Sequence, residues 1–320
     1  MSRLNRRAAM GLSLAAAGLG LAAAAGARTP KEPFFRGTGL PVGLQLYTLG
    51  ADLRANLDAM LGQVAQIGYR TVELAGYLGR TPAELRAAFD KAGLKATSSH
   101  VQGAPGGPDP SLADLDRVIA DAHVIGLSHI VMPMFQVPDR PEFKPRAGED
   151  RRAALARLGE ALTVEDWRRT ADFLNAKGKV LKAAGLTFGY HNHNVEFAPK
   201  GATNGLEILL KGTDPALVRF EMDVGWVVAA GHDPFALMAR HPGRFKMMHV
   251  KDVKATTRPN FAFQQDPTEV GSGIIDWKRL LAAAYGAGVR DFFVEQEPPF
   301  AKPRLEAVKV SFDYLNAVVA

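Results

Sequence analysis

Polar residues interrupt several apolar segments of this chain, and their types suit metal binding and proton transfer. Two apolar runs of strand length, Phe220–Val228 and Phe245–Val253, carry Asp223, His249 and Lys251. A strand covered on both faces is expected to be apolar throughout, so these residues require an explanation. Carboxylate and imidazole side chains bind divalent metals and also serve as general acids and bases.

The residues between the two runs predict how they are connected. Asp233 and Pro234 suit the N-cap and the first position of a helix, and His241-Pro242-Gly243 suits its end. The segment therefore reads as a strand, a crossover helix and a parallel strand. In a barrel built from such units, catalytic residues lie at the carboxyl ends of the strands, and these polar residues fall there.

The unit repeats along the chain, which predicts eight strand and helix pairs and an α/β (β/α)8 TIM barrel in a single domain. The predicted strands are Val42–Leu49, Thr71–Ala75, Lys95–Val101, His129–Met134, Thr187–Asn192, Val218–Asp223, Phe245–Val250 and Asp291–Glu295. The predicted helices lie near Ala51–Ile67, Pro82–Ala92, Leu112–Ile125, Val164–Ala184, Gly205–Lys211, Pro234–Arg240, Trp277–Ala287 and Arg304–Val318. The alternative, a doubly wound open sheet, requires a glycine-rich first turn, and none follows Leu44–Tyr47.

Two connections are longer than usual for this architecture. The first, Phe135–Glu160, is rich in arginine, and the second, Lys254–Gly273, follows the seventh strand. Both emerge at the carboxyl end of the barrel, where long loops form lids or dimer contacts. The arginines suit either a solvated face or the binding of a substrate or partner.

A barrel brings the ends of its strands together around one axial pocket. The polar residues expected there are Glu73, His100, His191, Asn192, His193, Glu196, Asp223, His249, Lys251, Glu295 and Glu297. A lone histidine is usually structural, but uncompensated buried charges from several strands would cost several kcal/mol each. One divalent cation would compensate them, and mixed imidazole and carboxylate ligands favour Mn²⁺, Co²⁺, Zn²⁺ or Fe²⁺ over Ca²⁺.

With these residues in place, the chain resembles the xylose-isomerase-like barrel superfamily of sugar phosphate isomerases and epimerases, which also includes inosose dehydratase and keto-sugar lyases. The resemblance covers the chain from about Val42 to its end. It rests on Tyr190-His191-Asn192-His193 with Glu196, Glu221-Met222-Asp223-Val224-Gly225-Trp226, Gly231-His232-Asp233-Pro234, His249-Val250-Lys251-Asp252, Glu269-Val270-Gly271-Ser272-Gly273 with Ile275-Asp276-Trp277, and Val294-Glu295-Gln296.

The resemblance implies a metal site. Members of the superfamily commonly bind one divalent ion through a Glu, an Asp, a His and a Glu on strands five to eight. Asp223, His249 and Glu295 match the last three positions. Strand five departs from the pattern, because His191 stands where many relatives have Glu, so His191 is the predicted fourth ligand. The exchange changes the charge of the ligand set from about −3 to −2.

The chemistry that the resemblance implies is enolisation, in which a carboxylate removes a proton next to a carbonyl group. Glu295 or Glu196 is the predicted base, and Lys251 the predicted acid or stabiliser of the enolate. Glu73 and His100 are expected to orient substrate hydroxyls, with His193 behind the ligands and Trp226 against the sugar ring. Glu73, His100 and Lys251 also suit structural ion pairs.

The first 27 residues differ from the rest of the chain. Asn5-Arg6-Arg7 precedes an uncharged run from Met10 to Ala25, and Ala25-Gly26-Ala27 suits a cleavage site. We therefore expect an export signal over 1–27, twin-arginine-like rather than an ordinary Sec signal, a linker over 28–40 and the barrel over 41–320. The mature protein is expected in the periplasm, without a stable membrane span.

Composition limits the possible partners. The chain has no cysteine, so disulfides do not stabilise it, and removal of the three arginines of residues 1–27 lowers the net charge from +6 to +3. That charge is too small to favour nucleic acid, and it argues against a metal-dependent endonuclease. We expect a small carbohydrate as the substrate, and a homo-oligomer is compatible with the long loops.

Three functions fit these observations. The first is a divalent-metal-dependent sugar isomerase or epimerase that acts by enolisation on a sugar or keto-sugar. The second is a dehydratase or β-eliminating lyase that acts on a 3-keto-glycoside or an inosose-like substrate. The third is an exported sugar-binding barrel without catalytic activity. Phosphorylated sugars are scarce outside the cytoplasm, so export favours an unphosphorylated or oxidised sugar.

Overall fold

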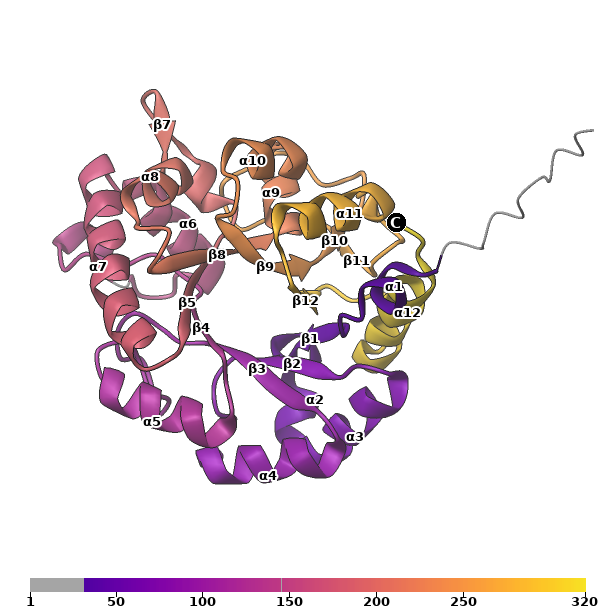
Figure 1. Cartoon of the computed structure of the whole chain (residues 1–320). Coiled ribbons are helices and arrows are strands. Elements are labelled where there is room, and N and C mark those ends of the chain that lie inside the picture. Colours follow the sequence, from indigo (N-terminus) through magenta and orange to yellow (C-terminus); the bar gives the residue numbers. More distant parts are fainter. Residues whose placement is uncertain (1–31, 145) are drawn as a thin grey trace, which may run out of the picture. The chain divides into compact units, whose positions relative to one another are not determined.

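The computed structural model describes residues 32–144 and 146–320, and in this part of the chain eight parallel strands close into a barrel (Figure 1). The barrel strands are β1 (Gly43–Gln45), β2 (Thr71–Leu74), β3 (Lys95–His100), β4 (His129–Met132), β5 (Thr187–His191), β8 (Val218–Asp223), β9 (Phe245–Val250) and β12 (Asp291–Val294). They follow one another around the barrel in chain order, and β12 pairs with β1 to close it. The predicted TIM barrel is confirmed.

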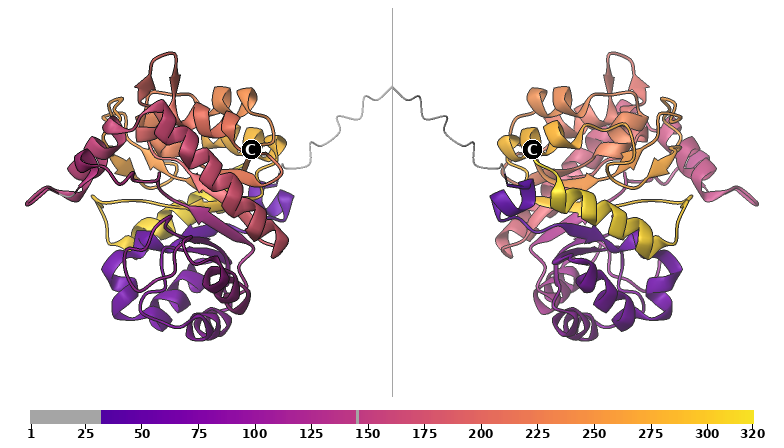
Figure 2. Two further views of the ribbon diagram at one scale, coloured as in Figure 1. Left: turned by 90° about the vertical axis from the view of Figure 1, so that its left-hand side faces the viewer. Right: turned by 90° about the vertical axis from the view of Figure 1, so that its right-hand side faces the viewer.

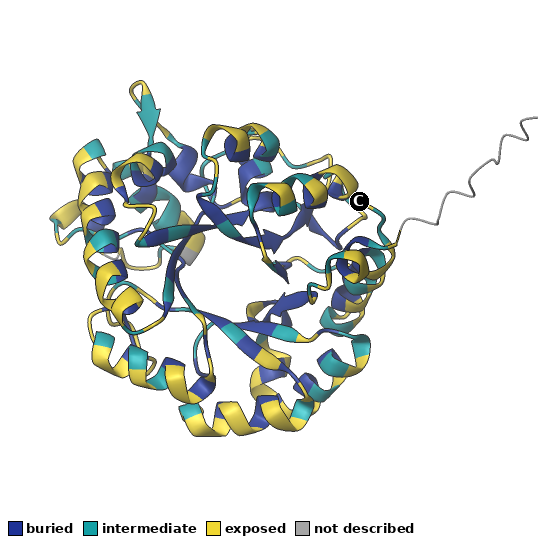
Figure 3. Ribbon diagram, viewed as in Figure 1, coloured by how far each residue is buried: buried dark blue, intermediate teal, exposed yellow. Residues whose placement is uncertain are grey.

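Helices surround the barrel. They are α1 (Phe34–Thr38), α2 (Gly50–Ala55), α3 (Leu57–Ile67), α4 (Pro82–Ala92), α5 (Leu115–Ile125), α6 (Arg151–Ala161), α7 (Val164–Ala183), α8 (Gly205–Gly212), α9 (Val224–Ala229), α10 (Pro234–Arg240), α11 (Trp277–Ala287) and α12 (Arg304–Ala317). Figure 3 shows buried residues along the strands and on the inner faces of the helices, and exposed residues on their outer faces. This distribution places the apolar core between the two layers.

Short elements complete the carboxyl end of the barrel. The 3₁₀ turns are η1 (Leu46–Leu49), η2 (Pro141–Phe143) and η3 (Val195–Phe197), and two antiparallel pairs join β6 (Pro199–Lys200) to β7 (Thr203–Asn204) and β10 (Asp252–Val253) to β11 (Pro267–Thr268). The β6–β7 hairpin projects from the body of the protein (Figure 2). None of the described helices is long and apolar enough to cross a membrane.

Several predicted boundaries differ from the structure. The first strand ends at Gln45 rather than Leu49, because the Gln45 side chain accepts a hydrogen bond from Tyr47 N and starts the turn η1. The predicted helix Ala51–Ile67 is two helices, since Asn56 ends α2 and caps α3. The apolar run Phe220–Val228 also divides, into β8 and the helix α9.

Most of the residues covered by the amino-terminal predictions lie outside the part of the chain that the structure describes. The export signal at 1–27 and the start of the linker at 28–40 lie outside the described part of the chain. The rest of the linker contains α1, which packs against α12 and buries Phe34 and Phe35. Both rings meet Phe292 of β12 edge-on, at centroid distances of 5.9 and 5.6 Å. This segment is therefore part of the folded body.

Asp252 holds together the turn that follows β11. Its carboxylate accepts hydrogen bonds from Gly271 N, Gly273 N and Ile275 N, at 2.9, 3.2 and 3.3 Å, and from Trp277 Nε1 at 2.9 Å. The glycine pair thus surrounds a buried carboxylate of the protein itself.

Candidate functional site

The carboxyl ends of the barrel strands bring a group of buried ionisable side chains to one place. They come from β2, β3, β5, β8, β9 and the residues just after β9 and β12: Glu73, His100, His191, Glu221, Asp223, His249, Lys251 and Glu295. Of these, only His100 is not fully buried. Alternation along β8 points Glu221 and Asp223 to the same side, into the barrel. The structure therefore brings together the residues predicted from separate strands.

The upper part of this group contains the predicted metal ligands, His191, Asp223, His249 and Glu295. His249 Nδ1 lies 3.1 Å from Glu295 Oε2 and 3.7 Å from Asp223 Oδ2, and His191 Nε2 lies 3.8 Å from Asp223 Oδ2. Ligand atoms of Asp223, His249 and Glu295 all lie within 4.8 Å of one another. His191 belongs to a second such set, with His100, Glu221 and His249, and it contacts the first set through Asp223. We call His191, Asp223, His249 and Glu295 the metal-ligand group.

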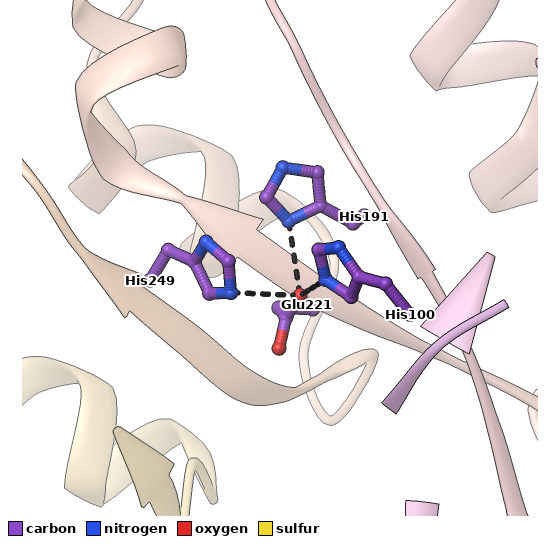
Figure 4. A group of neighbouring side chains, drawn as sticks. All are labelled: His100, His191, Glu221 and His249. Carbon is purple, nitrogen blue, oxygen red and sulfur yellow. Dashed lines mark hydrogen bonds and ion pairs between the residues drawn. The ribbon is translucent and has the colours of Figure 1, made fainter. Parts of the chain in front are cut away.

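A second layer of side chains lies toward the amino ends of the strands, since Glu221 precedes Asp223 by two residues on β8. Figure 4 shows His100, His191 and His249 around the carboxylate of Glu221. His191 Nδ1 lies 2.9 Å from Glu221 Oε2, and His249 Nε2 lies 3.2 Å from the same oxygen and 2.6 Å from Glu73 Oε1. His100 Nε2 is 3.0 Å from Glu221 Oε2. One ring nitrogen of His191 and of His249 thus faces the carboxylates of this second layer. The other ring nitrogen faces the carboxylates of the metal-ligand group.

This layering determines which ring nitrogens can bind a metal. A carboxylate accepts hydrogen bonds, so Glu221 and Glu73 favour a proton on the lower nitrogen of each ring. The upper nitrogens, His191 Nε2 and His249 Nδ1, then present lone pairs to the metal-ligand group. Carboxylates commonly orient metal-bound histidines in this way. Glu221 is accordingly a positioning residue shared by both imidazoles.

Lys251 lies between the carboxylates of the upper layer. Its Nζ is 2.7 Å from Asp223 Oδ2, 2.6 Å from Glu295 Oε2 and 3.0 Å from Glu297 Oε1. Burial acts to lower the pKa of Lys251, but these three carboxylates outweigh it and raise the pKa well above the usual value. The side chain is therefore a buried ammonium group.

Burial and neighbouring charges also determine the pKa values of Glu295 and His191. Burial acts to raise the pKa of Glu295, but Lys251 and His249 outweigh it, so the carboxylate stays ionised. Burial and the neighbouring His249 lower the pKa of His191 well below its usual value. A neutral imidazole and an ionised carboxylate are the forms that bind metals.

The residues present fit a divalent metal. The metal-ligand group supplies two imidazole nitrogens and two carboxylates, a donor set suited to Mn²⁺, Co²⁺, Zn²⁺ or Fe²⁺. Asp223 and Glu295 are buried carboxylates, and the partly buried Glu297 lies beside them on the other side of Lys251. Buried carboxylates favour a bound cation.

A cavity of about 490 Å³, here called the axial cavity, opens above the group. Its walls include Tyr47, His100, His191, His193, Trp226, Phe263, Glu295 and Glu297. His193 packs against Trp226 and Phe263, with centroid distances of 5.6 and 5.1 Å, and burial lowers its pKa to about 3. The neutral ring and its aromatic neighbours form an apolar wall beside the charged floor, as expected for a small-molecule site.

Five of the predicted site residues do not line this cavity: Glu73, Glu196, Asp223, His249 and Lys251. The last three contact the residues that do line it, whereas Glu196 and Glu73 have structural partners. Glu196 accepts hydrogen bonds from Tyr190 Oη at 2.7 Å and from His193 N at 2.9 Å, so it holds the turn after β5. Burial raises the pKa of Glu196 to about 7. Glu73 accepts from Gln45 Nε2 at 2.7 Å and supports His249 from below. Both are fully buried and do not line the cavity.

Sequence reasoning gave no role to two further residues of the site. Glu221 lies two positions before Asp223 on β8, and the two-residue period of a strand would have placed it on the same inward face. Glu297 appeared among the polar strand ends, but only the structure shows that it contacts Lys251 and lines the cavity.

Comparison with known proteins identifies the family. Residues 61–318 match the family model described as "Xylose isomerase-like TIM barrel". This chain belongs to that family. The resemblance noted in the sequence is therefore confirmed.

Curated relatives of this xylose isomerase-like protein are inosose dehydratases. One from Bacillus anthracis is 29% identical over 160 residues, which cover 46% of this chain and 53% of the relative. The chain thus spans about half the length of the first relatives that it matches. An inosose dehydratase from Geobacillus kaustophilus is 23% identical over 288 residues, which cover 82% of this chain and 87% of the relative.

Solved structures show the same architecture. A sugar phosphate isomerase/epimerase from Parabacteroides distasonis is 27% identical, covers 88% of this chain and 96% of its own, and has a TM-score of 0.67. The crystal structure of an IOLI protein with a binding zinc atom is 15% identical, with coverages of 88% and 99% and a TM-score of 0.63. At that identity the zinc-bound protein shows only the common fold.

Proposed function

We propose that this protein is a divalent-metal-dependent enzyme that enolises a sugar or keto-sugar, and that it isomerises or epimerises its substrate. The observation that carries the proposal is the contact between Lys251 and Glu295, whose Nζ and Oε2 lie 2.6 Å apart. Glu295 lines the axial cavity, and the fully buried Lys251 lies behind it. The ionised Glu295 can act as the base toward a small molecule in the cavity, and the ammonium group of Lys251 contacts that base directly.

His191, Asp223, His249 and Glu295 would hold the metal, which would polarise a carbonyl group of the sugar and make the neighbouring C–H bond more acidic. Glu295 takes the proton from that carbon, and the electron pair of the C–H bond forms the double bond of the enolate. Lys251 stabilises the negative charge that develops on the oxygen. His193, Trp226 and Phe263 exclude water from this side of the site.

The fate of the enolate decides the product. Return of the proton to the adjacent carbon isomerises the sugar, and return to the other face of the same carbon epimerises it. The full-length likeness to a protein described as a sugar phosphate isomerase/epimerase supports this first candidate. One carboxylate, Glu295, is enough to move a proton between two neighbouring carbons on the same face of the substrate.

The second candidate is β-elimination of water or an alcohol, as in a dehydratase or a lyase of 3-keto-glycosides. Lys251 favours it, because elimination requires a proton donor for the leaving oxygen, and this ammonium group lies next to the base. Inosose dehydratases among the curated relatives support it further. His191 also stands on strand five in place of a second carboxylate, which leaves fewer bases for a two-faced epimerisation.

Product analysis tests both candidates. The purified protein, loaded in turn with Mn²⁺, Co²⁺, Zn²⁺ or Fe²⁺, is incubated in D₂O with hexoses, inososes and 3-keto-glucosides. Enolisation incorporates solvent deuterium at the carbon next to the carbonyl. A product of unchanged mass, apart from deuterium, indicates isomerisation or epimerisation, and an unsaturated ketone indicates elimination. Sugar binding without deuterium exchange would instead support a non-catalytic sugar-binding barrel.

We also propose export to the periplasm through the twin-arginine-like signal of residues 1–27, which favours an unphosphorylated substrate. Fractionation of cells that express the full chain tests this. Replacement of Arg6 and Arg7 by Lys should retain the protein in the cytoplasm, and an unchanged periplasmic fraction would contradict the twin-arginine route.

A further inference from the structure

A second cavity lies beside the axial cavity at the carboxyl end of the barrel. Its volume is about 840 Å³, against about 490 Å³ for the axial cavity. Three segments form its walls, namely α6, the turn and strand at 198–200, and the loop at 261–264: Asp150, Arg152, Ala153, Ala156, Arg157, Glu160, Ala198, Pro199, Lys200, Phe261, Ala262 and Gln264. We call it the outer cavity. Both volumes are in the range of ligand sites.

The two cavities share a wall. Arg152 lines both of them, while the neighbours Leu155 and Ala156 on α6 each line one. The same holds on the opposite side, where Phe263 lines the axial cavity and Ala262 the outer one. At this point only the side chain of Arg152 separates the two cavities, and that side chain is half-exposed.

The shared wall lies close to the reactive groups. Arg152 Nη2 is 3.5 Å from Glu297 Oε2, and Glu297 Oε1 is 3.0 Å from Lys251 Nζ. One carboxylate thus separates the shared wall from the proposed proton donor. A group attached through an oxygen near Lys251 has a short path past Arg152 into the outer cavity.

Several polar groups at the outer cavity have partners within the protein. Arg157 binds Glu149 through two bonds of 2.7 and 2.8 Å, and Lys200 Nζ donates to the carbonyl oxygen of Glu160 at 2.7 Å. Asp150 accepts hydrogen bonds from the first turn of α6. Glu160 and Gln264 add a carboxylate and an amide to the walls, and six of the twelve wall residues are apolar: Ala153, Ala156, Ala198, Pro199, Phe261 and Ala262. These walls suit a neutral apolar or aromatic group rather than a phosphate.

We infer that the two cavities form one substrate cleft, in which a sugar ring lies in the axial cavity and a neutral aromatic or apolar substituent, joined to it through an oxygen, lies in the outer cavity. The substrate class is accordingly a glycoside rather than a free sugar. This inference rests on the proposed function, which puts the sugar ring above the metal-ligand group. In elimination the substituent is the leaving group, and in isomerisation or epimerisation it is carried unchanged.

Equilibrium binding tests the cleft separately from catalysis. Phenyl and methyl β-glycosides of glucose, galactose and mannose have no free carbonyl group and cannot be enolised, so calorimetry with the metal-loaded full chain measures binding alone. We expect wild type to bind the phenyl glycoside of at least one sugar about tenfold or more tightly than the methyl glycoside, because the ring buries apolar area.

Variants that fill the outer cavity should remove this preference. Ala153→Trp changes an exposed residue of α6, and Gln264→Trp changes an exposed residue on the facing loop, so at least one is expected to fold. In each folded variant the phenyl preference should fall below about threefold while methyl glycoside binding is retained. The matched control, Ala87→Trp, places the same bulk on an exposed position of α4 away from both cavities.

Three results would overturn the inference: no phenyl preference in wild type, an unchanged preference in the folded cavity variants, or binding of none of the glycosides. Failure of the proposed function looks different, because the phenyl preference and its loss in the variants would persist while no keto-sugar exchanged deuterium.

Discussion

At the scale of single residues, each charge in the site is held by several partners, so removal of one has a predictable effect. We expect Glu295→Gln to lower kcat for deuterium exchange by about 10²–10⁴-fold, because an amide cannot accept the substrate proton. Exchange measured by NMR checks this, with the exposed Glu306→Gln as control. Near-normal exchange by Glu295→Gln would show that another group is the base.

Glu221 gives a prediction about metal affinity. Glu221→Gln should weaken metal binding by about 10–100-fold, because a neutral amide orients the rings of His191 and His249 less firmly than a carboxylate does. Competition with a chelator, followed by metal analysis, measures the change. Glu196→Gln is the matched control, since Glu196 is equally buried but contacts Tyr190 and His193 instead. Equal losses in both variants would contradict the positioning role.

Lys251 gives a prediction about stability. Lys251→Met leaves Asp223, Glu295 and Glu297 without their shared cation, so the metal-free protein should lose about 3–5 kcal/mol of unfolding free energy. A dication supplies the missing positive charge, so added Mn²⁺ should raise the Tm of this variant more than that of wild type. Thermal unfolding with and without Mn²⁺ measures both effects. A smaller metal effect in the variant would mean that Lys251 does not compete for the same carboxylates.

At the scale of secondary-structure elements, the short helix α9 positions the site in two ways. Asp223 caps it by accepting a hydrogen bond from Trp226 N at 3.0 Å, which fixes a predicted metal ligand to the start of the helix. Gly225 leaves room for Lys251, because a Cβ at this position would lie 2.7 Å from Lys251 Cγ. Lys251 can pass this close to α9 only because residue 225 has no side chain.

This close approach makes Gly225→Ala informative. Alanine favours a helix over glycine by about 1 kcal/mol, so the fold should tolerate the change, but Lys251 must move away from Glu295. We expect kcat to fall about tenfold or more, because the enolate is less well stabilised, and Tm to fall as well, because the added Cβ displaces the buried stem of Lys251. The control is Gly62→Ala in α3, where nothing lies within 4 Å of the added Cβ and only the Tm should rise. Equal kcat values for the two variants would contradict a role for the placement of Lys251.

At the scale of the whole molecule, metal and protons compete for the centre of the barrel. Burial acts to lower the pKa of His249, but Glu221, Glu295 and Glu73 outweigh it and raise the pKa well above 6.5. In the metal-free protein, the protonated His249 contributes its full stabilisation at pH values below the pKa of an unfolded histidine. This stabilisation is lost as the pH rises through the pKa of His249 in the folded protein. A metal must displace this proton, so its affinity increases with pH.

The stabilisation by metal should therefore depend on pH. We expect the rise in Tm on addition of Zn²⁺ or Mn²⁺ to be small near pH 5.5 and to increase toward pH 8.5, as binding to the folded state becomes stronger. Differential scanning calorimetry at several pH values, with a chelator-treated sample at each, measures this. A rise in Tm that did not change with pH would indicate that the metal binds away from His249.

The sequence alone determined the barrel, because eight apolar strand segments alternate with amphipathic helices, and local periodicity and capping residues encode that order. It also determined that Asp223, His249, Lys251 and Glu295 meet, since any such barrel converges the carboxyl ends of its strands. Only the tertiary structure showed the layer beneath them. In the sequence, nothing distinguishes Glu221 and Glu73, which contact the histidine rings, from Glu196, which holds a turn. Their different roles depend on which ring nitrogen or backbone group packing brings within hydrogen-bond distance, and neighbours along the chain do not specify those contacts.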